Sequence, residues 1–173
     1  MIARYTRKEM AAVWTAESKF QKMLDVEIAV SHVQAKKKMI PAKAARDIRL
    51  KGRFSVARIE EIEKTTKHDV IAFVSNVAEN VGESGKYVHY ALTSSDVLDT
   101  ALSLQVLEAG QILSKTINQV EIAIYKQAAK HIGTHCAGRT HGMHAEVTTF
   151  GLKLAGFLAE LKRHQVRWQR AMA

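Results

Sequence analysis

The sequence predicts an all-α protein. Two long stripes of apolar side chains recur every three or four residues, one after residue 95 and one after residue 150, as they do along one face of a helix. Only one proline occurs in 173 residues, so little interrupts long helices. Hydrophobic residues make up 47% of the chain, which excludes a disordered or low-complexity polypeptide.

Shorter helices are predicted for the first part of the chain. Thr6 is expected to cap a short helix. An amphipathic helix is expected from about residue 18 to residue 39, where apolar side chains are spaced for 3.6 residues per turn, and Pro41 is expected to end it. A further helix should begin at a Ser55 cap and stop near Thr66.

A basic segment lies between residues 36 and 53, where Asp47 is the only acidic residue. Such a segment could contact the phosphates of a nucleic acid, but no aromatic side chain is interleaved to stack on bases. A solvated basic face is therefore the preferred interpretation. The whole chain has a net charge of +9, which favours anionic partners. The cations of the segment are Lys36, Lys37, Lys38, Lys43, Arg46, Arg49, Lys51 and Arg53.

Three polar residues, Lys67, His68 and Asp69, precede the apolar run of the next helix. Asp69 can simply cap that helix, with the other two facing water. Alternatively, the lysine ammonium and the backbone amides of a helix N-terminus favour a bound anion beside the histidine. These residues taken alone favour the capping interpretation.

Hydroxyl residues stand before the longest predicted helix. Thr93, Ser94 and Ser95 precede Asp96, and one hydroxyl is enough to cap a helix. The other two hydroxyls either have no binding role or bind a carboxylate above the free backbone amides of the helix. The helix should run from Ser95 to about Lys130. Its stripe consists of Leu102, Val106, Ala109, Leu113, Ile117, Val120, Ile124 and Ala128, and a second stripe of Phe150, Leu154, Phe157, Leu161 and Trp168 predicts a partner helix of at least twenty residues.

A polar segment from Gly138 to Gly151 joins the two long helices and is longer than a connection requires. Gly138 and Gly142 permit positive φ angles and the close approach of a ligand. Between them, Arg139 can form two hydrogen bonds to a carboxylate or phosphate, and His141 can exchange protons near neutral pH. The segment is an anion site with a proton donor or else a plain loop, and its own residues leave these interpretations equal.

Cysteine content and hydropathy bear on location. A single cysteine, Cys136, cannot form an internal disulfide, as fits a reducing cytosol. The first residues are charged where a signal peptide would be apolar, and no apolar run approaches the ~20 residues of a membrane span. We therefore expect a soluble cytoplasmic protein with no membrane partner.

Four segments together resemble one enzyme family. The segment Gly138–Gly151 resembles the second signature of the fumarase/aspartase superfamily, in the form typical of adenylosuccinate lyases. Lys67–Val70 and Leu92–Ala101 resemble two other signatures of the same family, in the expected order, and Arg4–Thr6 resembles its N-terminal substrate contact. These matches are spread over nearly the whole chain.

The resemblance implies an architecture and a reaction. Residues 1–92 would form an N-terminal helical domain, and residues 93–173 would begin a fumarase/aspartase-type bundle of long helices. The enzyme would be a homotetramer whose active sites draw on three subunits. It would release fumarate from adenylosuccinate to give AMP, and from the succinyl-carboxamide ribotide (SAICAR) to give the carboxamide ribotide (AICAR), in purine nucleotide synthesis. No metal or other cofactor is implied.

The resemblance also implies residue roles. His141 would be the general acid that protonates the leaving nitrogen, and His68 would be the second histidine of the site, supporting or orienting the acid near the phosphate. The remaining substrate contacts would be Arg4 and Tyr5 at the nucleotide end, Lys67 and Asp69 beside His68, Thr93 and Ser94 on the succinyl carboxylates, and His89 near the phosphate.

Two positions depart from the family pattern. Lys67 stands where arginine is more frequent, and it keeps the charge but loses the two-pronged geometry of a guanidinium. Val147 stands where a proline is usual. His141 argues against the related carboxymuconate cycloisomerases, which carry tryptophan at that position.

The family's third signature is a Gly-Ser-Ser-rich loop followed by Met-Pro-Tyr-Lys, and no segment of this chain matches it. That loop carries the serine that abstracts the carbon proton, so we expect these residues to be the N-terminal portion of a longer enzyme and to be inactive alone. The alternatives are a basic helical nucleic-acid-binding module and another fumarate-releasing lyase, such as argininosuccinate lyase. The preferred interpretation includes no nucleic-acid partner.

Overall fold

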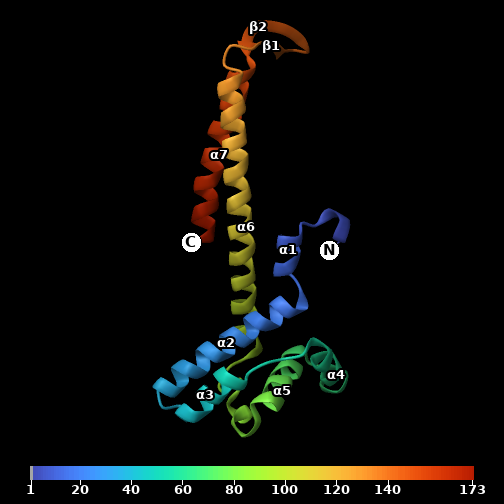
Figure 1. Ribbon diagram of the computed structural model, residues 1–173, viewed down its shortest axis with the longest axis vertical. Helices are drawn as coiled ribbons and strands as arrows, with labels where there is room; N and C mark the ends of the chain where they lie inside the picture. Colours follow the sequence, from blue (N-terminus) through green and yellow to red (C-terminus); the bar gives the residue numbers. More distant parts are fainter. Residues whose placement is uncertain (1) are drawn as a thin grey trace. The chain divides into compact units, whose positions relative to one another are not determined.

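The computed structural model describes residues 2–173 (Figure 1). Within these residues the chain forms seven α-helices, two short 3-10 helices and one two-stranded sheet. This confirms the predicted all-α class. The chain divides into two compact units, Met1–Ala109 and Gly110–Ala173, and each is described by itself.

The first unit contains five complete helices and the start of a sixth. Its elements are η1 (Ala3–Tyr5), α1 (Lys8–Val13), α2 (Ala16–Lys36), α3 (Ala42–Lys51), α4 (Val56–Thr66), α5 (Asp69–Val81), η2 (Gly82–Tyr87) and the first part of α6 (Ser94–Lys130). Figure 1 shows α2, α3, α4 and α5 grouped around a common centre.

The core of this unit is built around α5, whose apolar face is buried. Phe73 is fully buried and stacks on Phe20 of α2 with ring centroids 5.6 Å apart, while Phe54 tilts against both rings. Val97 and Ala101, at the start of α6, belong to the same core. Burial of these side chains is the main force that holds the short helices together, because helices of this length are marginal alone.

Most predicted helix boundaries are confirmed. Ser55 caps α4 by accepting a hydrogen bond from the Arg58 amide, and α4 ends at Thr66. Two boundary predictions in the first fifty residues are wrong. Thr6 caps no helix, because its hydroxyl donates to the Ile2 carbonyl instead, and Pro41 is the N-cap of α3, five residues beyond the end of α2.

The second unit is a helical hairpin. It comprises α6 from Gly110 onward, the strands β1 (His135–Thr140) and β2 (Met143–Thr149), and α7 (Phe150–Met172). The Trp168 indole donates to the Ser114 hydroxyl at 2.9 Å near one end, and the Gly151 amide donates to the His131 carbonyl at 2.9 Å near the other. The two helices therefore run antiparallel, side by side (Figure 1). Both long helices were predicted, and both are confirmed.

The polar connection between the helices is a β-hairpin where the sequence suggested a loop. Strands β1 and β2 pair antiparallel, with a register shift between Ala137 and Arg139. His141 and Gly142 form the turn with φ angles of 53° and 72°, the combination that a type I′ turn needs. Gly138 does not have a positive φ; a side chain there would meet the Glu146 carbonyl oxygen at 2.8 Å.

Candidate active site

The proposed acid, His141, lies at the tip of the β-hairpin. It occupies the first central position of the turn and is exposed. A left-handed backbone is uncommon for a residue with a side chain, although histidine tolerates it better than branched residues do. The closely paired strands on either side hold this conformation, with Thr140 opposite Met143. The hairpin thus presents an imidazole at a defined, accessible position.

The second predicted group lies between α4 and α5. Lys67 ends α4 in the left-handed conformation, with φ of 52°. His68 is the N-cap of α5, and its Nδ1 accepts a hydrogen bond from the Ile71 amide at 3.4 Å. The capping role predicted for Asp69 is therefore wrong: Asp69 is the first residue of the helix, and its carboxylate accepts from the Val70 amide.

This arrangement defines the atoms that His68 can offer to a ligand. Since Nδ1 accepts from the helix, it carries no proton, and the proton of the neutral ring is on Nε2. The imidazole is exposed at the positive end of α5. Lys19 of α2 adds a cation, with its Nζ 3.9 Å from the Asp69 carboxylate. This lysine could not be predicted from the motif around His68, because it comes from a distant helix.

The third group is the turn that carries His89. The backbone is left-handed at His89 and at Ala91, with φ angles of 63° and 55°. Two side chains of α2 form hydrogen bonds to this turn. Glu27 accepts from the His89 amide at 2.9 Å and lies 2.6 Å from its Nδ1, while the Gln34 amide donates to the Tyr90 carbonyl at 2.7 Å.

Glu27 and Gln34 were not predicted as partners of this turn, although their positions in the sequence carried a signal. They lie seven residues apart, two helical turns, on the face of α2 that also buries Met23 and Leu24. A carboxylate on an apolar helix face needs a buried partner, and only the fold identifies that partner as His89.

Thr93 directly precedes α6, and Ser94 and Ser95 are its first two residues, but among the described residues none of these hydroxyls caps the helix. The Asp96 carboxylate accepts from the Thr93 amide at 2.8 Å, which is half of a capping box. Within residues 2–173 the side-chain hydroxyls of Thr93, Ser94 and Ser95 make no hydrogen bond to protein. They are therefore available to an anion at the N-terminus of α6.

Arg4 and Tyr5 lie in η1, and both side chains are exposed. The Arg4 guanidinium lies over the Tyr5 ring, 4.7 Å from its centroid, which is a cation–π arrangement. In the part of the chain that the structure describes, neither side chain takes part in a hydrogen bond or a salt bridge. Their polar groups are thus not used by the fold.

The structure brings these residues together only locally. Lys67, His68 and Asp69 form one group, His89 pairs with Glu27, and Thr93 pairs with Asp96. Within residues 2–109, no hydrogen bond or salt bridge links one of these groups to another. His141 belongs to the second unit. Across residues 2–173, no group of His, Cys, Asp or Glu is placed to hold a metal ion, and no helix is long and apolar enough to cross a membrane.

Comparison with known proteins identifies the class. A family model described as "Lyase" matches residues 3–173, and the chain therefore belongs to this lyase family. Among curated proteins it is similar to the adenylosuccinate lyases of Synechocystis sp., Bacillus subtilis and Aquifex aeolicus, at 49%, 47% and 51% identity over 96%, 100% and 96% of the chain. The chain spans about 40% of the length of these relatives, 39%, 40% and 39% respectively.

Solved structures agree with this fold. A fumarate lyase from Mesorhizobium sp. BNC1 is 30% identical, with a TM-score of 0.86 over 93% of this chain and 39% of its own. A 3-carboxy-cis,cis-muconate lactonizing enzyme from Pseudomonas putida is 29% identical, with a TM-score of 0.87 over 96% of this chain and 40% of its own.

Proposed function

We propose that this chain carries the acid-bearing part of an adenylosuccinate lyase. The observation that carries the proposal is the exposed imidazole of His141 at the hairpin tip, within a segment whose sequence resembles the signature of that enzyme. Support comes from relatives of 41–51% identity that bear this name. The names of these relatives do not favour the two alternative functions, a nucleic-acid-binding module and argininosuccinate lyase.

The chemistry fits the residue types. In the elimination, a base removes a proton from the carbon next to a carboxylate, the carbon–nitrogen bond breaks, and the electron pair forms the double bond of fumarate. The departing nitrogen takes a proton from His141, a contribution of roughly 10² to 10⁴ in rate. Thr93 and Ser94 would hold the carboxylates of the succinyl group, where hydrogen-bond donors stabilise the charge that builds up.

The remaining contacts would surround the nucleotide. His68, with Lys67 and Asp69, would lie near the phosphate and support the acid, His89 would contact the phosphate, and Arg4 and Tyr5 would bind the nucleotide end. The hydroxyls of Thr93, Ser94 and Ser95 at the start of α6 and the cations beside His68 support an anionic substrate such as adenylosuccinate or SAICAR.

Assembly and location belong to the same proposal. The enzyme would be a homotetramer with residues 1–92 as an N-terminal domain and residues 93–173 as the start of the shared bundle, so that each active site combines segments of three subunits. Exposed apolar side chains along α6 and α7, such as Val120 and Phe157, support this assembly. The enzyme would be cytoplasmic, in keeping with the single, free Cys136.

The test is a pair of histidine variants in the full-length enzyme. His141→Ala should abolish release of fumarate from adenylosuccinate, while His135→Ala, an exposed histidine of β1 with no side-chain hydrogen bond within residues 2–173, should retain it. Circular dichroism checks that both variants fold. Full activity of folded His141→Ala would refute the proposed role. The 173-residue chain alone should release no fumarate, because it contains no serine loop.

A further inference from the structure

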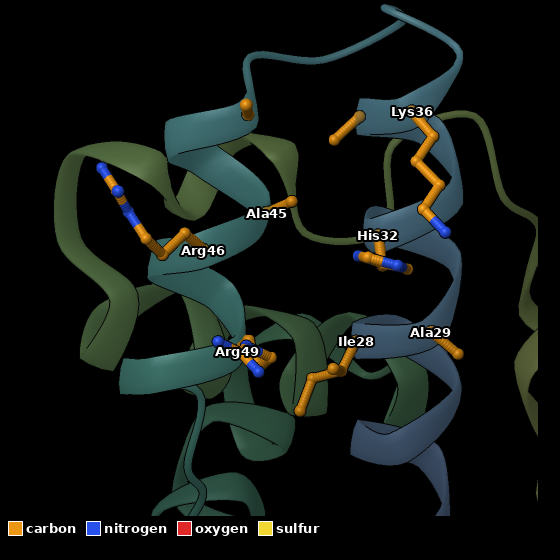
Figure 2. Close-up of a pocket in the computed structure, with 9 residues that line it drawn as sticks. Ile28, Ala29, His32, Lys36, Ala45, Arg46 and Arg49 are labelled. Carbon is orange, nitrogen blue, oxygen red and sulfur yellow. The ribbon is translucent and has the colours of Figure 1, made fainter.

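A groove of about 700 Å³ lies between α2 and α3. None of the proposed substrate-binding residues lines it. Figure 2 shows the two helices side by side, with Ile28 and His32 on α2 and Arg49 on α3 bordering the space between them. Its volume is within the range of small-molecule sites, roughly 300–1,000 Å³.

The groove has a basic rim. Lys36 and His32 come from α2, Arg46 and Arg49 come from α3, and among the described residues no carboxylate lines the space. All four side chains are exposed, and within residues 2–173 none of them takes part in a salt bridge. In Figure 2 Arg46 extends away from α2, Arg49 and His32 border the space between the helices, and Lys36 runs along α2 from the other end of the groove toward His32.

The one acidic side chain of the basic segment cannot neutralise this rim. Asp47 faces the other side of α3, where its carboxylate accepts from the Ser84 hydroxyl at 2.7 Å and pairs with Lys43 at 2.8 Å and Lys51 at 3.3 Å. Lys43 and Lys51 are thus paired with a carboxylate, whereas the cations around the groove, Lys36, Arg46 and Arg49, are not.

The floor of the groove is apolar. Four alanines and one isoleucine line it, and the small alanine side chains leave the space open between the helices. A bare inorganic anion would not use this apolar surface, whereas an organic molecule would bury part of itself against it. The lining residues of this floor are Ile28, Ala29, Ala35, Ala42 and Ala45.

We propose that the groove between α2 and α3 binds a small organic anion, with its phosphate or carboxylate attracted by the rim cations Arg49, His32 and Lys36 and a flat or aliphatic body on the alanine floor. Arginine and lysine supply charge-assisted hydrogen bonds to such a group. A nucleic-acid strand is a poorer occupant, because none of the aromatic side chains within residues 2–173 lines the groove to stack on bases. This site is independent of the proposed lyase activity.

The experiment follows backbone amide shifts of the 173-residue chain by NMR during titration with small probes. Phenyl phosphate and benzoate carry both a charge and a flat body, inorganic phosphate carries only the charge, and phenol carries only the body. Phenyl phosphate or benzoate should shift the amides of Ala29, His32, Ala45 and Arg49 saturably. Inorganic phosphate and phenol should bind at least about tenfold more weakly.

Matched variants distinguish specific binding of the probe in the groove from its non-specific attraction to a basic surface. Lys36→Gln with Arg49→Gln should weaken binding about tenfold or more. Lys37→Gln with Lys38→Gln removes the same charge from neighbouring residues that do not line the groove, and should leave binding unchanged. Ala29→Leu should fill the groove and weaken phenyl phosphate binding without changing charge. Equal losses in both double variants, unsaturable shifts, or equally tight inorganic phosphate would overturn the proposal.

Discussion

The imidazole of His89 is held by the carboxylate of Glu27, with Nδ1 of the histidine 2.6 Å from one oxygen and its backbone amide 2.9 Å from the other. The side chain of Glu27 is only 2% exposed and that of His89 is 14% exposed. Since a carboxylate accepts hydrogen bonds, Nδ1 carries the proton, and Nε2 is the atom left to meet a ligand. Glu27 is thus a positioning residue for His89.

Replacing Glu27 with glutamine should loosen this arrangement. The buried amide cannot match both hydrogen bonds of the carboxylate, and we expect a loss of about 1–3 kcal/mol in the free energy of unfolding, measured with urea. The nitrogen shifts of the His89 ring should also move toward a mixture of tautomers. Glu60→Gln is the matched control, because Glu60 is exposed and unpaired within residues 2–173. An unchanged tautomer in Glu27→Gln would contradict the positioning role.

Asp47 should make stability depend on pH. Hydrogen bonds from Lys43 and from Ser84 hold the pKa of Asp47 well below its ordinary value. The stabilisation is therefore fully present above the ordinary aspartate pKa of about 4, and it is lost as the pH falls toward the lower pKa of the folded state. Asp47→Asn should lower the urea midpoint at pH 7, and the difference from the parent should shrink at pH 3.

The control for that experiment is Asp99→Asn, since the Asp99 side chain forms no salt bridge in the described part of the chain. Asp99→Asn should change the urea midpoint at pH 7 less than Asp47→Asn does. A difference between Asp47→Asn and the parent that is the same at both pH values would show that the ionised carboxylate is not the source of the stabilisation.

At Gly151, the start of α7 lies close against the backbone at the end of α6 and in the turn that follows it. A side chain there would meet the Ala128 carbonyl oxygen at 2.6 Å and the Ile132 Cα at 2.7 Å, and both are backbone atoms. Gly151→Ala should therefore force the helices apart and cost about 1–3 kcal/mol in unfolding free energy, measured by thermal or urea unfolding. Gly156→Ala, on the same helix with open space around it, should be neutral or stabilising. Equal effects of the two substitutions would rule out the contact.

Helices were predictable from the sequence because local rules govern them. Apolar spacing located α6 and α7, and Ser55 marked the start of α4. The hairpin was not foreseen, because its strands are largely exposed and lack the alternation of apolar residues that identifies a buried strand. The glycine after His141 was its one local signal, as the second residue of a type I′ turn.

The candidate site was predictable only in part, for a different reason. Motifs located His68, Thr93 and His141 along the chain, but the partners that hold the site residues come from distant segments. Glu27 lies 62 residues before His89, and Lys19 lies on another helix than Asp69. A short sequence window cannot identify such pairs, because they depend on how the helices pack.

Self-association is the last prediction and concerns the second unit. Two antiparallel helices leave much of their apolar stripes in water: Val120 is 44% exposed, and Phe157 is 50% exposed. Such surface favours contact with other copies, so sedimentation of the 173-residue chain at micromolar concentration should give a species heavier than its 19.3 kDa. Val120→Lys should shift it toward the monomer, whereas Gln119→Lys adds the same charge at the neighbouring polar position and should not. A parent chain that sediments as a monomer throughout this range would contradict the prediction, and with it the support that these stripes give to a tetramer.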